Sequence, residues 1–272
     1  MTLLASVVIP TYNQKDLLKI CLRSLFAQTA SPDIYELIVI DDGSTDGTDA
    51  VVAGLAKEAP CKFTCVKQEN LGRSRTRNNG ALRASGKYLI FLDGDMIVRA
   101  SFVAAHLAAH TRPGLIVHGP VINTPKIADP SVGPKKVCDF SRAFFATGNV
   151  SIEREKFLAA GMFDEDFVEY GWEDLELGER LRKMGLKTAK SPEAYSYHYT
   201  PRFTCQSIPR MIAKEKERGH TAVLFYRKNP SLEVRIMTLI TPIYFAYDRL
   251  LTLFHWPERP AALKLLKWLD RP

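Results

Sequence analysis

The chain has 272 residues, of which 46% are hydrophobic and 25% are charged. This composition is close to the average of globular proteins and excludes a disordered chain, a collagen-like fibre and a polytopic membrane protein. The net charge of +7 is concentrated at one end, because residues 205–272 carry 12 basic and 6 acidic side chains. A basic tail favours a polyanionic partner, either nucleic acid or an anionic membrane surface.

The cysteine content and the N-terminal sequence indicate the cellular compartment in which the protein is expected. Five cysteines without a CxxC pair favour a reduced environment over a disulfide framework. Cys61 and Cys65 have no matching second pair, so their spacing does not favour a zinc site. Residues 1–5 contain neither a basic segment nor a cleavage site, which indicates the lead-in to a strand rather than a signal peptide. We therefore expect a cytoplasmic protein.

Apolar runs alternate with helical periodicities over the first 92 residues. The expected strands are 6–9, 36–40, 62–67 and 88–92, and the expected helices are 15–28, the region around 51–55, and 74–84 with Ser85-Gly86 as a glycine C-cap. Such alternation predicts an α/β fold, with a Rossmann-like, mostly parallel central sheet flanked by helices on both faces.

The second half of the chain is less regular. Residues 120–142 are rich in Pro and Gly and predict a long loop that acts as a lid or a binding segment. A short helix is expected near 153–160. A further helix is expected over about 173–184, because acids begin it, basic residues end it and Gly185 follows.

The basic tail from residue 206 is expected to be helical. Its residues 236–247 are uncharged and mostly apolar, but twelve residues are too few to cross a bilayer. We expect this segment either to lie on the cytoplasmic face of a membrane, anchored by Tyr244, Tyr247 and Trp256, or to pack as a core helix. The tail shows no aromatic interleaving on a recognisable nucleic-acid-binding module, so nucleic acid is not an expected partner.

Polar motifs follow three of the expected strands: Pro10-Thr11-Tyr12-Asn13, Asp41-Asp42 and Asp93-Gly94-Asp95. In open α/β sheets, ligands bind beyond the carboxyl ends of the strands. The three motifs therefore predict one ligand site at one edge of the sheet.

Two of these motifs are acidic and each has two interpretations. In an extended segment Asp93 and Asp95 share one face, with Gly94 leaving room for a phosphate, and two carboxylates suit Mg²⁺ or Mn²⁺ held together with substrate phosphates. Asp41-Asp42 is suited to accept hydrogen bonds from a nucleotide base or ribose. The alternative for both motifs is an ordinary polar turn.

Further candidate functional residues lie outside these three motifs. Glu173-Asp174 begins a helix, where acids are favoured by the helix dipole in any case, but a helix start beside Trp172 also offers a fixed, partly desolvated position for a general base. His198 either has a structural role or is a ligand of a bound group. Arg73, Arg75 and Arg77 either face solvent or meet a diphosphate.

Taken together, the motifs resemble those of the family 2 glycosyltransferases in order and spacing, over about residues 5–200. The matching segments are 8–13, 39–46, 77–78, 93–95 and 172–174. Thr147-Gly148-Asn149 and the segment 161–165 also look like the acceptor-side half of galactosyltransferase-like members. The resemblance implies a GT-A fold over residues 1–204, with a nucleotide-sugar-binding half (1–100), an acceptor-binding half (101–204), and a helical C-terminal extension (205–272).

The resemblance also implies a reaction and roles for particular residues. The reaction is an inverting, metal-dependent transfer of a sugar from a nucleotide-diphosphate donor, with UDP favoured, to an acceptor hydroxyl in glycan or glycolipid biosynthesis. The implied roles are nucleotide-sugar binding for Pro10, Thr11, Tyr12, Asp41, Asp42, Arg77, Asp93 and Gly94; divalent metal (Mn²⁺ or Mg²⁺) binding for Asp95, Asp93 and His198; catalysis for Asp174, as the general base, and for Glu173; and acceptor binding for Trp172 and Glu173.

Some alternatives stay open. Residues 206–211 lack the Gln-x-x-Arg-Trp motif of processive members, so transfer of one or a few sugars is expected. A nucleotidyltransferase acting on sugar phosphates is expected to have a glycine-rich phosphate-binding loop after the first strand, and this sequence has no such loop there. A non-catalytic nucleotide-sugar-binding protein is the other alternative. The acceptor is open between a lipid-linked sugar, a glycan and a small molecule.

Overall fold

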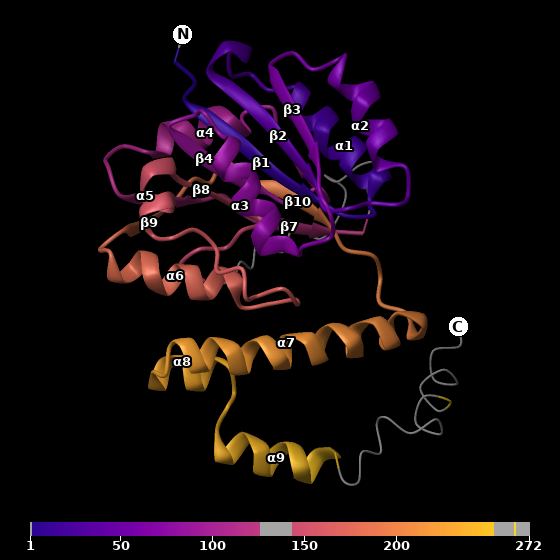
Figure 1. Ribbon diagram of the computed structural model, residues 1–272, viewed down its shortest axis with the longest axis vertical. Helices are drawn as coiled ribbons and strands as arrows, with labels where there is room; N and C mark the ends of the chain where they lie inside the picture. The colour runs from indigo at the N-terminus through magenta and orange to yellow at the C-terminus, as the bar shows by residue number, and fades with distance from the viewer. Residues whose placement is uncertain (1, 126–142, 253–263, 265–272) are drawn as a thin grey trace. The chain divides into compact units, whose positions relative to one another are not determined.

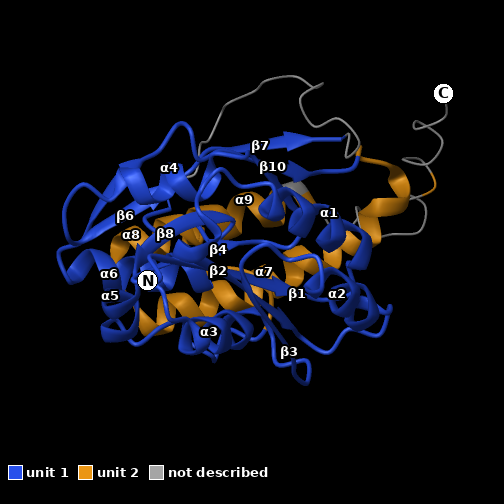
Figure 2. Cartoon of the chain, turned by 90° about the horizontal axis from the view of Figure 1, so that it is seen from above, with its two compact units in different colours: residues 1–168, 173–201 blue, residues 169–172, 202–272 orange. Residues whose placement is uncertain are grey.

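A computed structural model describes residues 2–125, 143–252 and 264. The chain forms two compact units, which Figure 2 shows in blue and orange. Unit 1 comprises residues 1–168 and 173–201, and unit 2 comprises residues 169–172 and 202–272.

Unit 1 is built on a seven-stranded sheet (Figure 1). In spatial order its strands are β3 (Lys62–Lys67), β2 (Tyr35–Asp41), β1 (Ala5–Thr11), β4 (Tyr88–Leu92), β8 (Asn149–Glu153), β6 (Leu115–His118) and β9 (Lys187–Lys190). Strands β3, β2, β1 and β4 are parallel, as are β6 and β9. Only β8 runs antiparallel to its neighbours, β4 and β6. The expected mostly parallel sheet is therefore confirmed.

Helices cover both faces of this sheet, because its central strands β2, β1 and β4 are apolar on both sides. The helices of unit 1 are α1 (Lys15–Phe26), α2 (Thr48–Ala56), α3 (Arg73–Arg83), α4 (Phe102–Ala109), α5 (Arg154–Ala159) and α6 (Glu173–Lys183), with one 3₁₀ turn, η1 (Pro32–Ile34). Val7 and Ile9 of β1 pack in one cluster with α1, α2 and α4. Val8, on the opposite side of the same strand, packs in a second cluster with α3, α5 and α6.

A second, three-stranded sheet was not expected. It has the order β5 (Met96–Val98), β10 (Ser196–Tyr199) and β7 (Val121–Thr124). Strand β7 lies within residues 120–142, so the prediction of a loop is wrong for its first residues, and residues 126–142 lie outside the described part of the chain. The sheet matters for the site because β10 places His198 opposite Met96, directly after the Asp93-Gly94-Asp95 motif.

Unit 2 is helical, as expected. It contains η2 (Cys205–Ser207), α7 (Ile208–Lys228), α8 (Leu232–Met237) and α9 (Pro242–Thr252). Residues 236–247 do not form one helix, because the chain breaks between α8 and α9, where Leu239 has a φ of 58°. Within the described residues, no helix is long and apolar enough to span a membrane. Within unit 2 the described side chains of α9, residues 242–250, are all exposed.

Gly86 has a different role from the one expected. It is not a helix C-cap, because α3 ends at Arg83 and Ala84 already has an extended backbone, with a φ of −66° and a ψ of 137°. Instead Gly86 packs against β1: a Cβ at this position would lie 2.5 Å from the carbonyl carbon of Ala5 and 2.7 Å from the amide nitrogen of Ser6. Close approach of two backbones therefore explains the glycine.

We predict that Gly86→Ala lowers the free energy of unfolding by about 2 kcal/mol or more, because the new methyl group meets backbone that cannot move without disturbing β1. Gly54→Ala is the matched control. Gly54 lies in α2 with no atom within 4 Å of its Cβ position, so this variant should gain about 0.5–1 kcal/mol in stability. Urea unfolding measures both, and equal stabilities would contradict the packing argument.

Candidate active site

The three predicted strand-end motifs lie at one edge of the sheet, as expected from the parallel pairing of β1, β2 and β4. Thr11 and Asp41 are register partners on β1 and β2, and the Asp42 amide donates to the Thr11 carbonyl at 2.9 Å. Tyr12 is 48% exposed, whereas Asp41 is buried. Two buried oxygens here, Thr11 Oγ1 and Asp41 Oδ2, have no hydrogen-bond partner among the described residues. Unsatisfied buried oxygens of this kind point to a polar ligand.

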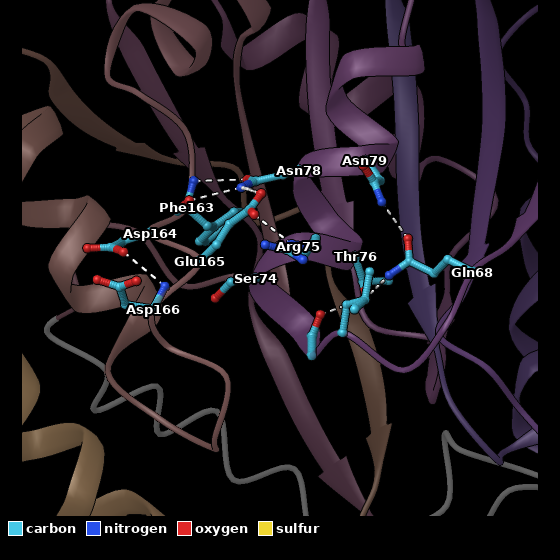
Figure 3. Close-up of polar contacts among 12 residues, drawn as sticks. Gln68, Ser74, Arg75, Thr76, Asn78, Asn79, Phe163, Asp164, Glu165 and Asp166 are labelled. Carbon is cyan, nitrogen blue, oxygen red and sulfur yellow. Dashed lines mark hydrogen bonds and ion pairs between the residues drawn. The ribbon is translucent and has the colours of Figure 1, made fainter.

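Asp42 holds the segment that leads into α3. One carboxylate oxygen accepts from the Gln68 side chain at 2.8 Å and from the Leu71 amide at 2.9 Å, and the other accepts from the Gly72 amide at 3.0 Å. Gln68 in turn contacts Thr76 and Asn79 on α3, as Figure 3 shows. The start of α3 is therefore fixed by a carboxylate at the end of β2, and a contact between Asp42 and a nucleotide base stays a prediction.

The Asp93-Gly94-Asp95 motif is a turn rather than the extended segment that was expected, so the alternation of side chains along a strand does not apply to it. The Met96 amide donates back to the Asp93 carbonyl at 3.2 Å, because the chain turns here from β4 into β5. The two carboxylates take different partners. The glycine is explained by packing, since a Cβ on Gly94 would lie 2.7 Å from Gln14 Nε2 and 3.1 Å from the Pro10 carbonyl oxygen.

Arg77 joins Asp93 to the start of α6. Its Nη2 donates to Asp93 Oδ1 at 2.8 Å and its Nη1 to Glu173 Oε1 at 3.1 Å. The side chains of Arg77 and Glu173 are only 4% and 6% exposed. Burial alone would raise the pKa of Asp93, but the Arg77 guanidinium outweighs it, and the pKa lies below its ordinary value. Of the two interpretations of Arg77, exposure to solvent is therefore wrong.

Asn78, the next residue of α3, binds the backbone of Phe163, whose ring lies beside Arg77. Its amide group donates to the Phe163 carbonyl and accepts from the Phe163 amide, both at 2.9 Å (Figure 3). Arg75 binds Glu165 in the same segment at 2.6 Å. The Phe163 ring also lies 5.7 Å from the Arg77 guanidinium. Asn78 is thus a supporting residue. The family resemblance includes residues 77–78, but no sequence signal predicts the hydrogen bonds of Asn78 to Phe163.

Asp174 carries the most perturbed carboxyl group of this cluster. It is half-buried at the start of α6, and one of its oxygens accepts from the Leu175 amide at 2.8 Å. Burial first, and then the negative charge of Glu173, raise its pKa to about 7, and Arg77 only partly opposes this. A carboxyl group that titrates near neutral pH is suited to accept a proton from a hydroxyl. Trp172, the preceding residue, belongs to unit 2.

Asp95, the other acid of the turn, lies close to a histidine. His198 Nε2 lies 3.3 Å from Asp95 Oδ2, and His198 Nδ1 lies 3.0 Å from Asn123 Oδ1, which orients the ring. Asp95 Oδ1 is buried without a hydrogen-bond partner among the described residues. No three metal-ligating side chains gather within the described ranges, because Asp93 faces Arg77. The orphaned oxygen and the nearby imidazole nonetheless fit a divalent cation.

The Thr147-Gly148-Asn149 motif lies beside the same turn. A Cβ on Gly148 would be 3.7 Å from Asp93 Oδ2 and 3.0 Å from the Met96 side chain. Asn149 is buried and binds His106 Nε2 at 2.8 Å and the Ala194 carbonyl at 2.8 Å. The motif therefore supports the turn through packing and a buried hydrogen-bond network.

The fold and the edge cluster define a GT-A type protein, and comparison with known families agrees. Residues 6–159 match the model described as glycosyl transferase family 2, and residues 132–203 match the N-terminal domain of galactosyltransferase. The chain belongs to the family 2 glycosyltransferases.

The chain is also similar to individual glycosyltransferases. It is 32% identical to a validoxylamine A glucosyltransferase of Streptomyces hygroscopicus subsp. limoneus, over 88% of this chain and 59% of the relative. With the same-named protein of subsp. jinggangensis the covered share is 64%, so the chain spans about three fifths of the length of these relatives.

Two solved structures show the same fold at 19% sequence identity. The mannosyltransferase PcManGT from Pyrobaculum calidifontis, in complex with GDP-Man and Mn²⁺, has a TM-score of 0.67 over 99% of this chain and 80% of that one. TarS of S. aureus, in complex with UDP-GlcNAc, has a TM-score of 0.58 over 74% and 60%.

The pKa of Asp174 predicts a pH-dependent effect on stability. In the folded chain this pKa is about 7, above the ordinary 3.8. The protonated form therefore stabilises the fold at low pH, and this stability is lost as the pH rises through 7. We predict that Asp174→Asn, which cannot ionise, is more stable than wild type, and that the gain is larger at pH 8 than at pH 5. Urea unfolding at both pH values measures it. The exposed Asp33 provides the control variant Asp33→Asn, and an equal gain at both pH values would contradict the shift.

Proposed function

We propose that the chain is an inverting, metal-dependent, non-processive glycosyltransferase that moves a sugar from a nucleotide-diphosphate donor to an acceptor hydroxyl in glycan or glycolipid biosynthesis. The observation that carries this proposal is the Arg77 bridge, which links Asp93 at the sheet edge to Glu173 beside Asp174. It brings a carboxylate at the donor edge and a base on α6 into one charge cluster. Residues 1–100 are the proposed nucleotide-sugar half, 101–204 the acceptor half and 205–272 an extension.

The donor is proposed to bind across the carboxyl ends of β1, β2 and β4. The side chains proposed to line its nucleotide part are Pro10, Thr11, Tyr12, Asp41 and Asp42, with Asp93, Gly94 and Arg77 toward the ribose and sugar. The unpartnered buried oxygens of Thr11 and Asp41 support this placement. The donor is proposed to be a UDP-sugar, and the two structural neighbours, with GDP-Man and UDP-GlcNAc, set the alternatives that a test must include.

Asp95 and His198 are the proposed metal-binding residues, with Asp93 as the third member of the predicted set. A bound Mn²⁺ or Mg²⁺ supplies positive charge that makes the departing diphosphate a better leaving group. The support is the unpartnered Asp95 Oδ1 beside the His198 imidazole. Because Asp93 already contacts Arg77, we propose that it contributes less to metal binding than Asp95 and His198 do.

Asp174 is the proposed general base. Its carboxylate takes the proton of the acceptor hydroxyl while that oxygen bonds to the anomeric carbon. The bond from the anomeric carbon to the diphosphate oxygen breaks on the opposite face, so the configuration inverts and the nucleoside diphosphate leaves. Arg77 holds Glu173, which is proposed to bind acceptor hydroxyls, and Glu173 in turn raises the pKa of Asp174.

The competing functions are less well supported. A nucleotidyltransferase is expected to have a basic, glycine-rich loop after β1. In this chain Tyr12 and Asn13 follow β1, and Asn13 is hydrogen-bonded to Ser44 and Thr45. A non-catalytic binder would have no need of a carboxyl group poised near neutral pH.

The central test is a thermal-shift panel of UDP-glucose, UDP-galactose, UDP-GlcNAc and GDP-mannose, with and without Mn²⁺, followed by product analysis with the best donor. We predict release of the nucleoside diphosphate, and a fall of about 10²–10⁴-fold in rate for Asp174→Asn with its donor-induced thermal shift intact. Pyrophosphate as the product, or full activity of Asp174→Asn, would reject the proposed function.

The metal role has a separate test. We predict that chelation with EDTA abolishes activity, that Mn²⁺ restores it, and that Asp95→Asn or His198→Gln raises the half-saturating Mn²⁺ concentration by about 10-fold or more. Asp33→Asn is the control. Unchanged metal dependence in both site variants would show that these residues do not hold the cation.

We further propose that unit 2 binds an anionic membrane surface. Eight large apolar or aromatic side chains between residues 232 and 250 are exposed: Leu232, Ile236, Leu239, Ile243, Tyr244, Phe245, Tyr247 and Leu250. Exposed apolar surface of this density marks an interaction site, and the basic charge of residues 205–272 favours anionic lipid headgroups.

We predict that the chain floats with vesicles containing phosphatidylserine, and that Ile243→Asp with Phe245→Asp abolishes flotation, because two carboxylates oppose both burial and the lipid charge. Met184→Asp, at an exposed position in unit 1, is the control. Flotation that persists in the double variant would contradict this proposal.

A further inference from the structure

The four residues Glu169–Trp172, which lie directly before Glu173, are held by α7. Each contact is within unit 2. His220 Nδ1 lies 3.1 Å from the Glu169 carboxylate, and the Tyr170 amide donates to Glu217 at 3.3 Å. The Thr221 hydroxyl donates to the Tyr170 carbonyl at 3.0 Å.

Trp172 makes the most extensive of these contacts. Its indole N–H donates to the Arg218 carbonyl at 2.8 Å. Its ring is stacked on Phe225, with centroids 6.0 Å apart and planes at 25°, and the Arg218 guanidinium lies 5.2 Å from the ring. The polar group of the indole is therefore already used within unit 2.

The backbone of this segment is unusual. Gly171 has a φ of 107° and Trp172 a φ of 70°. A bulky residue in the left-handed region is strained, and such a conformation persists only where surrounding contacts determine it. A Cβ on Gly171 would lie 3.1 Å from Arg218 Cγ. The same helix thus lies against both positive-φ residues, immediately before the chain enters α6.

We infer that α7 positions the Glu173–Asp174 pair through this segment, and that Trp172 is a positioning residue held by α7 rather than a side chain that binds the acceptor. The inference deepens the proposed function, on which the catalytic meaning of the pair rests. A general base must be held close to its working geometry, and a misplacement of about 1 Å costs on the order of 10²-fold in rate.

The first test needs no substrate, so it stands even if the proposed function fails. Asp174 is faced by Glu173 and Arg77, and its environment is read from the rise in Tm that Asp174→Asn produces at pH 8. We expect less than half of this rise when Trp172→Ala is also present, because the released segment lets Asp174 move toward water. Thr221→Val serves as a milder variant if Trp172→Ala does not fold. Val223→Ala, on the exposed side of α7, should leave the rise unchanged. The same rise in all backgrounds overturns the inference.

The second test separates positioning from acceptor binding. Hydrolysis of UDP-glucose, UDP-GlcNAc and GDP-mannose is measured with Mn²⁺ and without an acceptor, so that water is the nucleophile. A positioning role predicts about a 10-fold or larger loss of hydrolysis in Trp172→Phe, with the donor-induced thermal shift intact. Unchanged hydrolysis in Trp172→Phe, together with a large loss in Asp174→Asn, overturns the positioning role and leaves acceptor binding as the function of Trp172.

Discussion

A single buried guanidinium holds the candidate active site together. Arg77 is almost fully removed from water, and an unpaired buried charge of this kind is strongly destabilising. Its two carboxylate partners come from segments that are distant along the chain, Asp93 from the end of β4 and Glu173 from the start of α6. The need to neutralise one cation therefore fixes the distance between the two proposed substrate sides. It also holds the carboxylate of Glu173, whose negative charge raises the pKa of the neighbouring Asp174, an effect that the charge of Arg77 only partly opposes.

The position of Arg77 is itself determined by polar contacts at the start and in the middle of α3. Asp42 accepts three hydrogen bonds from the segment that enters the helix. Asn78 makes a paired hydrogen bond to the backbone of Phe163. A residue at the end of β2 that was predicted to contact a nucleotide thus also serves to orient the helix that carries the bridging arginine. Substitutions at Asp42 are consequently expected to affect both binding and structure, and kinetics alone will not separate the two.

The sequence predicts most of unit 1, because short apolar runs and helical periodicities are local signals. It does not predict the sheet of β5, β10 and β7, whose strands have three or four residues and are stabilised by pairing between residues as far apart in the sequence as Met96 and His198. The same limit applies to the site. Arg77 and Glu173 are 96 residues apart, so no spacing rule could pair them, and only the family resemblance placed both at one site. The error at Asp93-Gly94-Asp95 was local: the alternation rule holds in a strand, but the chain turns there.

The separate partners of Asp93 and Asp95 bear on how metal and donor are expected to bind. With Asp93 occupied by Arg77, the protein offers a cation chiefly one carboxylate and one imidazole. Mg²⁺ and Mn²⁺ sites of this kind are completed by water and by substrate phosphates rather than by the protein. Under the proposed function, the diphosphate is thus part of the metal site. The cation and the nucleotide sugar should then strengthen each other's binding, and by thermodynamic linkage the factor must be the same in both directions.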